Sequence, residues 1–522
     1  MAISVSRKNS PGWWLEKCFT KRAAGLARLN DLDAWRKGEP PVPQAVKEAR
    51  EAFREFESEA VTNWAQLIVA LLRERLGVRD IRTGASGDDP DEEAWSYWLA
   101  SNLDVEFSTF VDTMLWAGDA YAMVGEDEDG DVSVTPQDPR DVVTFHDPIR
   151  QSRYRAAARF LHDGDEGKDY VYLSVAGRYF DDGYARVFVA VKSGDGTAST
   201  GFDPKAWSWD KEQGGPDGQA LNHGLVPVVR LRNTGGMGEF EPFLPQLRRI
   251  NRFTFQLSVI ILYQAYKQRA ILADVDDPDA AARGDLANTF NVEDLEDVLT
   301  SDPGSWFLLP SGSKVWESTQ ADTQGLVAAI KAEQLSLAAV SRRPMGMFAP
   351  DNQSASGANF TREGLTFAVE DKQKRLRRFL VDVFYLIFLT TGDEERADKK
   401  NIRVSFTPAD RYTITDKASA TSQVSSVLPL RTILREVWQM SPDEIAAVEA
   451  EAADAALLFS DAMESMTPEQ ARAASDSLGI LVRAGATPDS AAEKVGLGGL
   501  TFIDAMPVTL RPPEAKEPVQ GV

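Results

Sequence analysis

The residues of this sequence that could carry out chemistry are few and widely spaced. The stretch "NTGGMGEF", residues 233–240, is the nearest approach to a phosphate-binding loop, because its glycines precede a predicted helix. The sequence contains no G-x-x-x-x-G-K-[ST] pattern, and Gly167-Lys168 is followed by Asp169, so no P-loop is predicted. We therefore interpret 233–240 as a turn between a strand and a helix. A nucleotide-binding enzyme that uses this turn and a neighbouring carboxylate is an alternative hypothesis.

Histidine, cysteine and acidic side chains also lack the spacing of known sites. The single cysteine, Cys18, has no histidine nearby in sequence, which predicts an inert thiol. The acidic turn that begins at Asp127 departs from the calcium-loop pattern at its glycine and at its last glutamate. None of the histidines has the spacing of zinc ligands; they are His146, His162 and His223. We therefore expect no metal, no cofactor and no catalytic residue.

Two polar segments follow each other near residue 360. The stretch "GMFAPDNQSASGANF", residues 346–360, is rich in small and amide side chains, and in isolation it predicts a solvent-exposed linker. A basic run lies on the predicted helix that follows it: Lys372, Lys374, Arg375, Arg377 and Arg378.

Composition limits the class of protein. The chain has 522 residues, of which 80 are acidic and 57 basic, so its net charge of −23 argues against bulk attraction to DNA or to an anionic membrane. The length suggests about three or four structural units. A single cysteine excludes an internal disulfide framework and fits a reducing compartment. The N-terminus has no apolar core of signal-peptide length, and the uncharged stretch 253–266 is too short to span a bilayer.

Periodic patterns predict an α+β protein with an insertion. Helices are expected at 44–76 and 91–117, with a Pro/Gly-rich segment at 38–43 that separates the first of them from an N-terminal arm. Asp129-Gly130 predicts a hairpin, and further strands are expected between 154 and 232.

The second half begins with a pattern typical of a projecting stalk with a knob. A helix is predicted at 243–273, then an acidic segment at 274–303, a hairpin in "WFLLPSGSKVW", and a returning helix at 322–342. After the polar stretch, a long helix is expected at 361–390, then one strand in "IRVSFTP" and a helical C-terminal part.

The order of these parts resembles the portal proteins of tailed bacteriophages, in the siphovirus group typical of phages of actinobacterial hosts. The resemblance rests on six stretches in order and covers essentially the whole chain. They are "NWAQLIVALLRERLGV", "FVDTMLWAGDAYAMVGEDEDGDVSVTPQDPRDVVTFHDP", "HGLVPVVRLRN" with the helix after it, "SRRPMGMF" with the polar loop, "VLPLRTILREVWQMSPDEIA" and "GILVRAGATPDSAAEKVGLGGL".

The resemblance implies the portal fold. Its parts would be a wing (1–242, rejoined by a spine helix and strand at 361–425), paired stem helices (243–273 and 322–342), a clip (274–321), a tunnel loop (343–360) and a helical crown with a tail (426–522). It also implies a homo-oligomeric ring of about twelve copies at one capsid vertex of the virion, assembled in the host cytoplasm. The implied partners are double-stranded DNA in the channel, the terminase ATPase, a head-tail adaptor protein, and the major capsid and scaffolding proteins, with no membrane.

The same resemblance assigns roles to polar residues. The tunnel loop would face DNA through Asn352, Gln353, Ser354, Ser356 and Asn359. The basic run 372–378 would pair with acidic groups of a neighbouring subunit or would contact phosphate. The clip would offer a docking face made of Asp276, Asp277, Glu293, Asp294, Glu296 and Asp297. The portal would be passive and would serve genome packaging, retention and ejection. Another structural head protein, such as a minor capsid component, is the alternative of the same general class.

Overall fold

The computed structural model describes residues 3–41, 59–87, 89–126, 130–193, 201–265, 269–272, 314–317, 322–348, 355–409, 414–438, 440, 444–452 and 468–495. The chain divides into two compact units, Met1–Arg411 and Tyr412–Val522. The predicted boundary between wing and crown lay about fourteen residues later, at 425.

The first unit begins with helix α1, Pro11–Lys37. Ser10 caps its N-terminus by accepting a hydrogen bond from the Trp13 amide, and Pro11 suits the first turn because it needs no amide partner there. Gly38 ends the helix in the left-handed region, with φ 82°. The sequence pattern predicts an N-terminal arm here, and helix α1 corrects that prediction.

The largest sheet of the unit is antiparallel, and its strands run in the order β4-β5-β6-β7-β8, with β9 also pairing with β7. Its inner face buries Phe160 and Phe188 against Trp14 and Phe19 of α1. A 3-10 turn at Gly177–Tyr179 follows β6. The strands are β4 Val142–His146, β5 Tyr154–Asp163, β6 Lys168–Val175, β7 Arg186–Ser193, β8 Ser208–Trp209 and β9 Gln219–Ala220.

A second sheet has three strands in the order β10-β2-β3. Strands β2, Asp119–Glu126, and β3, Val132–Gln137, form the predicted hairpin around Gly130, and β10, Val228–Arg232, pairs with the other edge of β2. Because side chains alternate along a strand, Ala120 and Ala122 face one core, whereas Tyr121 faces the large sheet.

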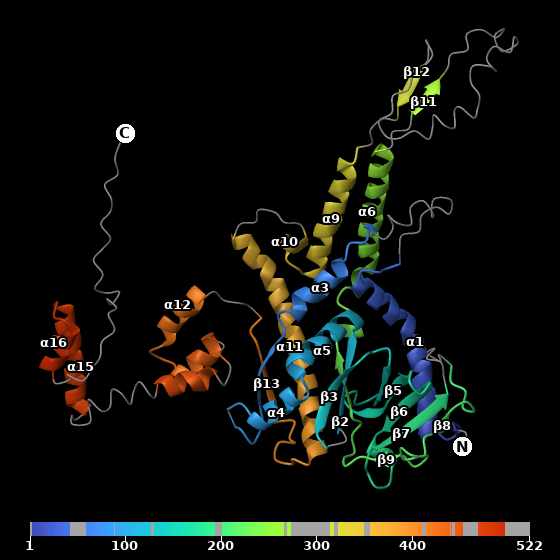
Figure 1. The fold of residues 1–522 in the computed structure, drawn as a ribbon, viewed down its shortest axis with the longest axis horizontal. Coiled ribbons are helices and arrows are strands. Elements are labelled where there is room, and N and C mark those ends of the chain that lie inside the picture. The colour runs from blue at the N-terminus through green and yellow to red at the C-terminus, as the bar shows by residue number, and fades with distance from the viewer. Residues whose placement is uncertain are drawn as a thin grey trace. The chain divides into compact units, whose positions relative to one another are not determined.

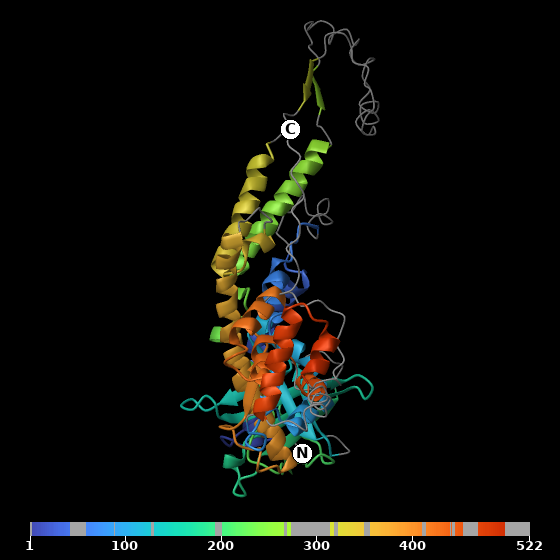
Figure 2. The same cartoon turned by 90° about the vertical axis from the view of Figure 1, so that its left-hand side faces the viewer.

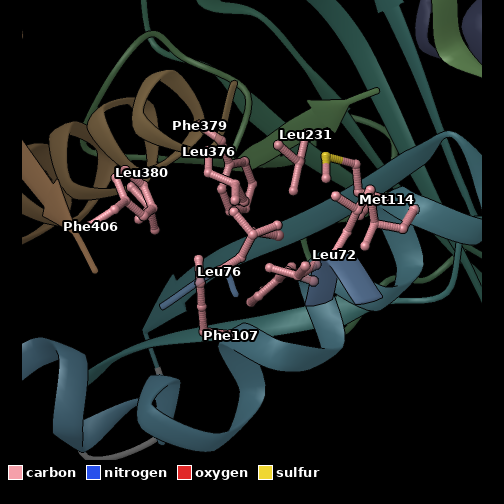
Figure 3. Packing of buried hydrophobic residues seen from close by; sticks show 14 of the residues in the cluster. Leu72, Leu76, Phe107, Met114, Leu231, Leu376, Phe379, Leu380 and Phe406 are labelled. Atoms are coloured by element: carbon pink, nitrogen blue, oxygen red, sulfur yellow. The ribbon is translucent and has the colours of Figure 1, made fainter. Parts of the chain in front are cut away.

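Helices cover the face of this sheet that carries Ala120 and Ala122, and together they form the main core of the unit. Figure 3 shows Met114, Leu231, Leu376 and Phe379 meeting in this core. The predicted helix at 91–117 is two helices, because Asn102 adopts φ 50° between them. The covering helices are α3 Trp64–Arg73, α4 Glu92–Ala100, α5 Leu103–Ala117 and α11 Ala355–Thr391.

The predicted strand in "IRVSFTP" is present and joins distant parts of the chain. It is β13, Arg403–Phe406, and it pairs antiparallel with β1, Val78–Arg82. Because of this pairing, the segment that follows α11 lies against the N-terminal part of the unit.

Two antiparallel helices, α6 (Leu244–Ala265) and α9 (Gln324–Ser341), form an arm of the first unit. Figures 1 and 2 show them side by side, with strands β11, Arg269–Leu272, and β12, Lys314–Glu317, beyond their far ends. The predicted insertion between two helices is therefore present. The first helix ends eight residues before the predicted residue 273, and β12 pairs with β11; residues 306–313 of the expected hairpin lie outside the described part.

The predicted loop 343–360 is partly helical. It contains the short helix α10, Met345–Phe348, and the first turns of α11, while residues 349–354 lie outside the described part. Short 3-10 turns at Thr234–Gly236 and Glu241–Phe243 connect β10 to α6.

The second unit is helical where it is described, as predicted. It contains α12 Ile414–Val424, α13 Leu430–Ile433, a π-helical turn at Leu434–Trp438, α15 Pro468–Arg483 and α16 Pro488–Lys494. Among the described residues of the whole chain, no helix combines the length and apolar character that crossing a bilayer requires.

Candidate functional site

The glycine-rich stretch 233–240 is a closed turn. Its backbone amides are used within the protein: Gly236 donates to the Asn233 carbonyl (2.9 Å), Glu239 to the Leu115 carbonyl (2.7 Å) and Gly238 to Glu241 Oε2 (2.8 Å). These amides cannot at the same time cradle a phosphate. The turn interpretation is favoured, and the nucleotide-binding alternative loses its main observation.

Two glycines of this region serve close packing. A Cβ atom on Gly238 would lie 2.2 Å from the Trp116 carbonyl oxygen, and one on Gly118, whose φ is 89°, would lie 2.4 Å from the Gly236 carbonyl oxygen. Real Cβ atoms do not approach so closely, so both positions need glycine. The turn is pressed against the end of α5.

Glu239 is the centre of a buried charged network. Lys372 Nζ of α11 lies 2.7 Å from Glu239 Oε1, and Arg343 Nη2 lies 3.0 Å from Glu239 Oε2. Asn233 joins them: its Nδ2 donates to Glu239 Oε1 (3.0 Å), and its Oδ1 accepts from Lys372 Nζ (2.7 Å). The network ties together the turn after β10, the end of arm helix α9 and the middle of α11.

Burial of these charged groups costs free energy unless the charges stay paired. The side chains of Arg343 and Lys372 are only 2% and 5% exposed. Burial acts to raise the pKa of Glu239, but Lys372 and Arg343 outweigh it and hold that pKa below its ordinary value. The carboxylate is therefore charged at neutral pH and holds two buried cations.

Lys372 corrects the prediction for the basic run. It was expected to meet phosphate or a neighbouring subunit, but it is used inside the chain, because its side chain points from α11 into the turn. Helical periodicity places Lys372 and Leu376 on the same face of α11, and both are buried there.

The remaining cations of the run lie on exposed or half-buried faces of α11. Arg375 pairs with Asp371 (3.1 Å) and Arg378 with Asp382 (3.2 Å). Arg377 donates to the Val404 carbonyl (3.2 Å). Among the described residues, exposed Lys374 has no ion-pair partner. Three of the four cations thus already have partners within the chain.

Most of the polar positions assigned by resemblance lie outside the described part. Ser356 and Asn359 lie in the first turns of α11, a helical setting that the loop prediction did not expect. The remaining predicted loop residues, Asn352, Gln353 and Ser354, lie outside the described residues. So do all the predicted clip residues: Asp276, Asp277, Glu293, Asp294, Glu296 and Asp297.

Cysteine and histidine occupy structural positions. Cys18 is fully buried, and burial raises the pKa of its thiol to about 12, so a thiolate is scarce at neutral pH. Burial and the nearby Arg230 lower the pKa of His146 to about 4. His162 contacts Asp169 (2.8 Å), and burial lowers the pKa of His223.

Sequence reasoning missed the partners Glu239 and Arg343. Both lie in segments that it had singled out, "NTGGMGEF" and "SRRPMGMF", but for other reasons. The available signal was one acidic residue in the first segment and two arginines in the second, among otherwise apolar or small residues. Such a pattern favours an internal ion pair only once the two segments are known to meet.

The comparisons with known proteins concern nearly the whole chain. The family model described as "Phage portal protein, SPP1 Gp6-like" matches residues 15–457. No curated protein matches the sequence.

Solved structures also match at low sequence identity. A chain of "Neck of empty GTA particle computed with C6 symmetry" is 10% identical over 78% of this chain and 98% of its own, with a TM-score of 0.42. A chain of the neck of a native GTA particle, computed with C12 symmetry, is 10% identical over 75% and 92%, with a TM-score of 0.39. An HK97 family phage portal protein from Corynebacterium diphtheriae is 12% identical over 71% and 97%, with a TM-score of 0.31.

Proposed function

Because the chain belongs to the SPP1 Gp6-like family of phage portal proteins, we propose that it forms a ring of about twelve copies at one capsid vertex, with a central channel for DNA. The family match over residues 15–457 is the observation that carries this proposal. The ring would conduct the genome during packaging and ejection and would retain it between those events.

The arm of α6 and α9 supports a role in subunit contact. Near its base the two helices are joined within the chain, where Arg249 Nη2 lies 3.0 Å from Glu333 Oε2 and Leu247 and Leu337 are buried. Farther out, Ile261 and Val327 are 54% and 50% exposed. Neighbouring copies in a ring would cover these apolar side chains, with a gain of about 25 cal/mol for each Å² of apolar surface removed from water.

Polar contact with DNA is assigned to the residues around the start of α11. Amide and hydroxyl groups of Asn352, Gln353, Ser354, Ser356 and Asn359 would touch the phosphate backbone without the lasting grip of a cation. With a net charge of −23 per chain, twelve copies would carry about −280, so most surfaces of the ring would repel the duplex and let it slide.

Docking is assigned to the acidic clip, residues 274–321. Its carboxylates, which include Asp276 and Glu293, would meet the terminase ATPase during packaging and a head-tail adaptor protein afterwards. The wing would meet the major capsid and scaffolding proteins. The ring would assemble in the host cytoplasm and remain in the virion at the capsid vertex.

The proposed ring is passive: the ATPase that moves the DNA is a separate protein. The closed turn at 233–240 supports this, because its amides and its carboxylate Glu239 are already engaged. Purified protein should therefore show no ATP hydrolysis, and turnover that follows the protein through further purification would contradict a passive role.

Particle symmetry separates a portal from a minor capsid component. Class averages of negatively stained purified protein, or of heads that contain it, should show rings with a central channel. Absence of rings from both preparations would overturn the proposal.

A further inference from the structure

A cluster of cations lies where α1, β2, β4 and β10 meet. It consists of Lys21 and Arg28 on α1 and Arg230 and Arg232 on β10, and all four act electrostatically on Asp119 of β2. Residues two apart on a strand face the same side, and Arg232 pairs in register with Asp119. Regular secondary structure thus directs four cations toward one carboxylate.

The carboxylate does not satisfy the two arginines. Arg230 Nε and Arg232 Nε lie 3.9 Å and 3.8 Å from Asp119 Oδ1, which is too far for a hydrogen bond. Asp119 Oδ1 is buried and accepts no hydrogen bond from any described residue. Within the described part of the chain, Asp119 is also the sole ion-pair partner of the Arg230 guanidinium. The guanidinium groups of Arg230 and Arg232 therefore lie beside Asp119 without an acceptor at hydrogen-bonding distance.

Solvent reaches the two arginines of the cluster unequally. The side chain of Arg230 is 13% exposed and that of Arg232 is 49% exposed, so Arg230 is mostly buried and Arg232 is open to solvent. Exposed Lys21 donates to the Thr144 carbonyl (2.7 Å), which holds its ammonium beside β4. All three groups act electrostatically on Asp119, so a small anion beside this carboxylate would lie near each of them.

The charges of the cluster do not cancel. Arg28 is bonded to Glu241, with Nε 2.7 Å from Oε1, and it also donates to the Gly236 carbonyl. Four cations against the two carboxylates Asp119 and Glu241 leave an excess of two positive charges. This local excess stands out in a chain whose net charge is −23.

The same cations also act on the pKa of His146. Burial is the main cause that lowers its pKa to about 4; Arg230 is the next, and Lys21 and Arg232 add to it. The hydrogen bond between His146 Nδ1 and the Gln151 carbonyl (2.8 Å) acts in the opposite direction but does not prevent the shift. The imidazole is therefore neutral at pH 7 and adds no charge to the cluster.

We propose that this cluster binds one phosphate-sized oxyanion, held by the guanidinium groups of Arg230 and Arg232 and by the ammonium of Lys21. Guanidinium forks and an ammonium group that approach from two elements suit an anion with several oxygens. The source could be free phosphate or a phosphate of a DNA backbone, which share this chemistry. The proposal does not depend on ring formation.

Calorimetric titration of the full-length protein with inorganic phosphate, at low ionic strength and with chloride as the reference anion, tests the site. We expect saturable binding of one phosphate per chain. Arg232→Met and Lys21→Met should each weaken it about tenfold or more, because each removes a charged donor. Asp119→Asn should strengthen it, because the competing negative charge is removed.

Lys168→Met is the matched control, since it removes an exposed, paired lysine outside the cluster. Absence of saturable binding, or an equal loss in Lys168→Met, would overturn the proposal. The expected gain in Asp119→Asn keeps the test decisive, because loss of folding cannot produce tighter binding. Competition by a short DNA duplex identifies the source: displacement of phosphate supports a backbone phosphate in the site, and no displacement supports a free anion there.

Discussion

Glu239 shows how one carboxylate can join three distant segments. It binds Lys372 of α11 and Arg343 beyond α9, and its own turn is closed by amide bonds. A buried pair of this kind is weak evidence for net stability, but loss of one member leaves the other charge uncompensated in a poorly solvated place. The network therefore specifies one arrangement of arm, turn and spine helix.

The first prediction concerns the members of this network. Glu239→Gln leaves Arg343 and Lys372 buried without a carboxylate, so it should lower the free energy of unfolding by about 3–5 kcal/mol. Lys372→Met should cost less, because Arg343 still pairs with Glu239. Thermal unfolding measures both effects. Lys374→Met, an exposed position two residues away, is the control and should change stability by less than about 0.5 kcal/mol.

An equal midpoint for Glu239→Gln and Lys374→Met would show that the network does not constrain the fold. A loss in Lys372→Met larger than in Glu239→Gln would show that packing of the lysine stem, and not charge pairing, dominates.

The second prediction is the pH dependence of the same carboxylate. Its pKa in the folded protein lies below the ordinary value of 4.5, so its stabilisation is fully present above that pH and is lost as pH falls through the folded value. The difference in unfolding midpoint between wild type and Glu239→Gln should be constant near neutrality and shrink below about pH 4.5. Asp33 and Asp91 also have lowered pKa values, but they are common to both proteins and cancel in the difference. A difference that stays constant through pH 3 would contradict the assignment.

At the scale of elements, long periodic segments could be predicted and short or context-dependent ones could not. The apolar stripe of α6 and the alternation in β10 follow from local sequence, and both elements are where the patterns place them. Strand β11 was assigned to a continuing helix, because its four residues gain their strand conformation from β12, more than 40 positions later. Helix α1 was missed although Ser10-Pro11 and Gly38 mark its ends.

The candidate site was the least predictable part, for a physical reason. Lys372 looked like one cation among five on a helix, and only the placement of Glu239 and Arg343 shows that it is buried. Sequence spacing gives the face of a helix that a residue occupies, but not the segment that covers this face.

The third prediction tests the arm as a contact between copies. Ile261 is 54% exposed in the single chain, so Ile261→Asp should leave the monomer folded, with little change in its unfolding midpoint. In a ring the new carboxylate would be placed against apolar surface and would cost several kcal/mol at each contact. Gel filtration and negative stain should therefore show fewer rings. Ile149→Asp makes the same change at a 90% exposed turn position and should assemble normally. Normal rings from the Ile261 variant would contradict the proposed contact.

At the scale of the whole molecule, we expect that some substitutions impair DNA passage without impairing ring assembly. The main core lies in the first unit, among residues such as Met114, Leu231 and Phe379, and the arm is attached to it through α9 and the Glu239 network. The residues assigned to the channel carry small hydroxyl or amide side chains, which rarely build an apolar core. Changes at these positions should therefore affect DNA more than folding.

The last prediction makes this separation explicit. Replacing Asn352, Gln353 and Ser354 together by Ala should leave ring abundance and thermal stability nearly unchanged, while heads that contain the variant package or retain less DNA. Replacing the same three residues by Glu should have a stronger effect, because about three added charges per chain would face phosphates across a narrow gap, where screening is incomplete. Packaged DNA per head, measured against ring abundance, is the readout. Gln151→Glu, Ser152→Glu and Gln213→Glu together, at exposed positions of turns of the large sheet, add the same three charges away from the channel segment and should package normally. Full packaging and retention by the Glu variant at normal ring abundance would show that the segment is a linker and takes no part in DNA passage.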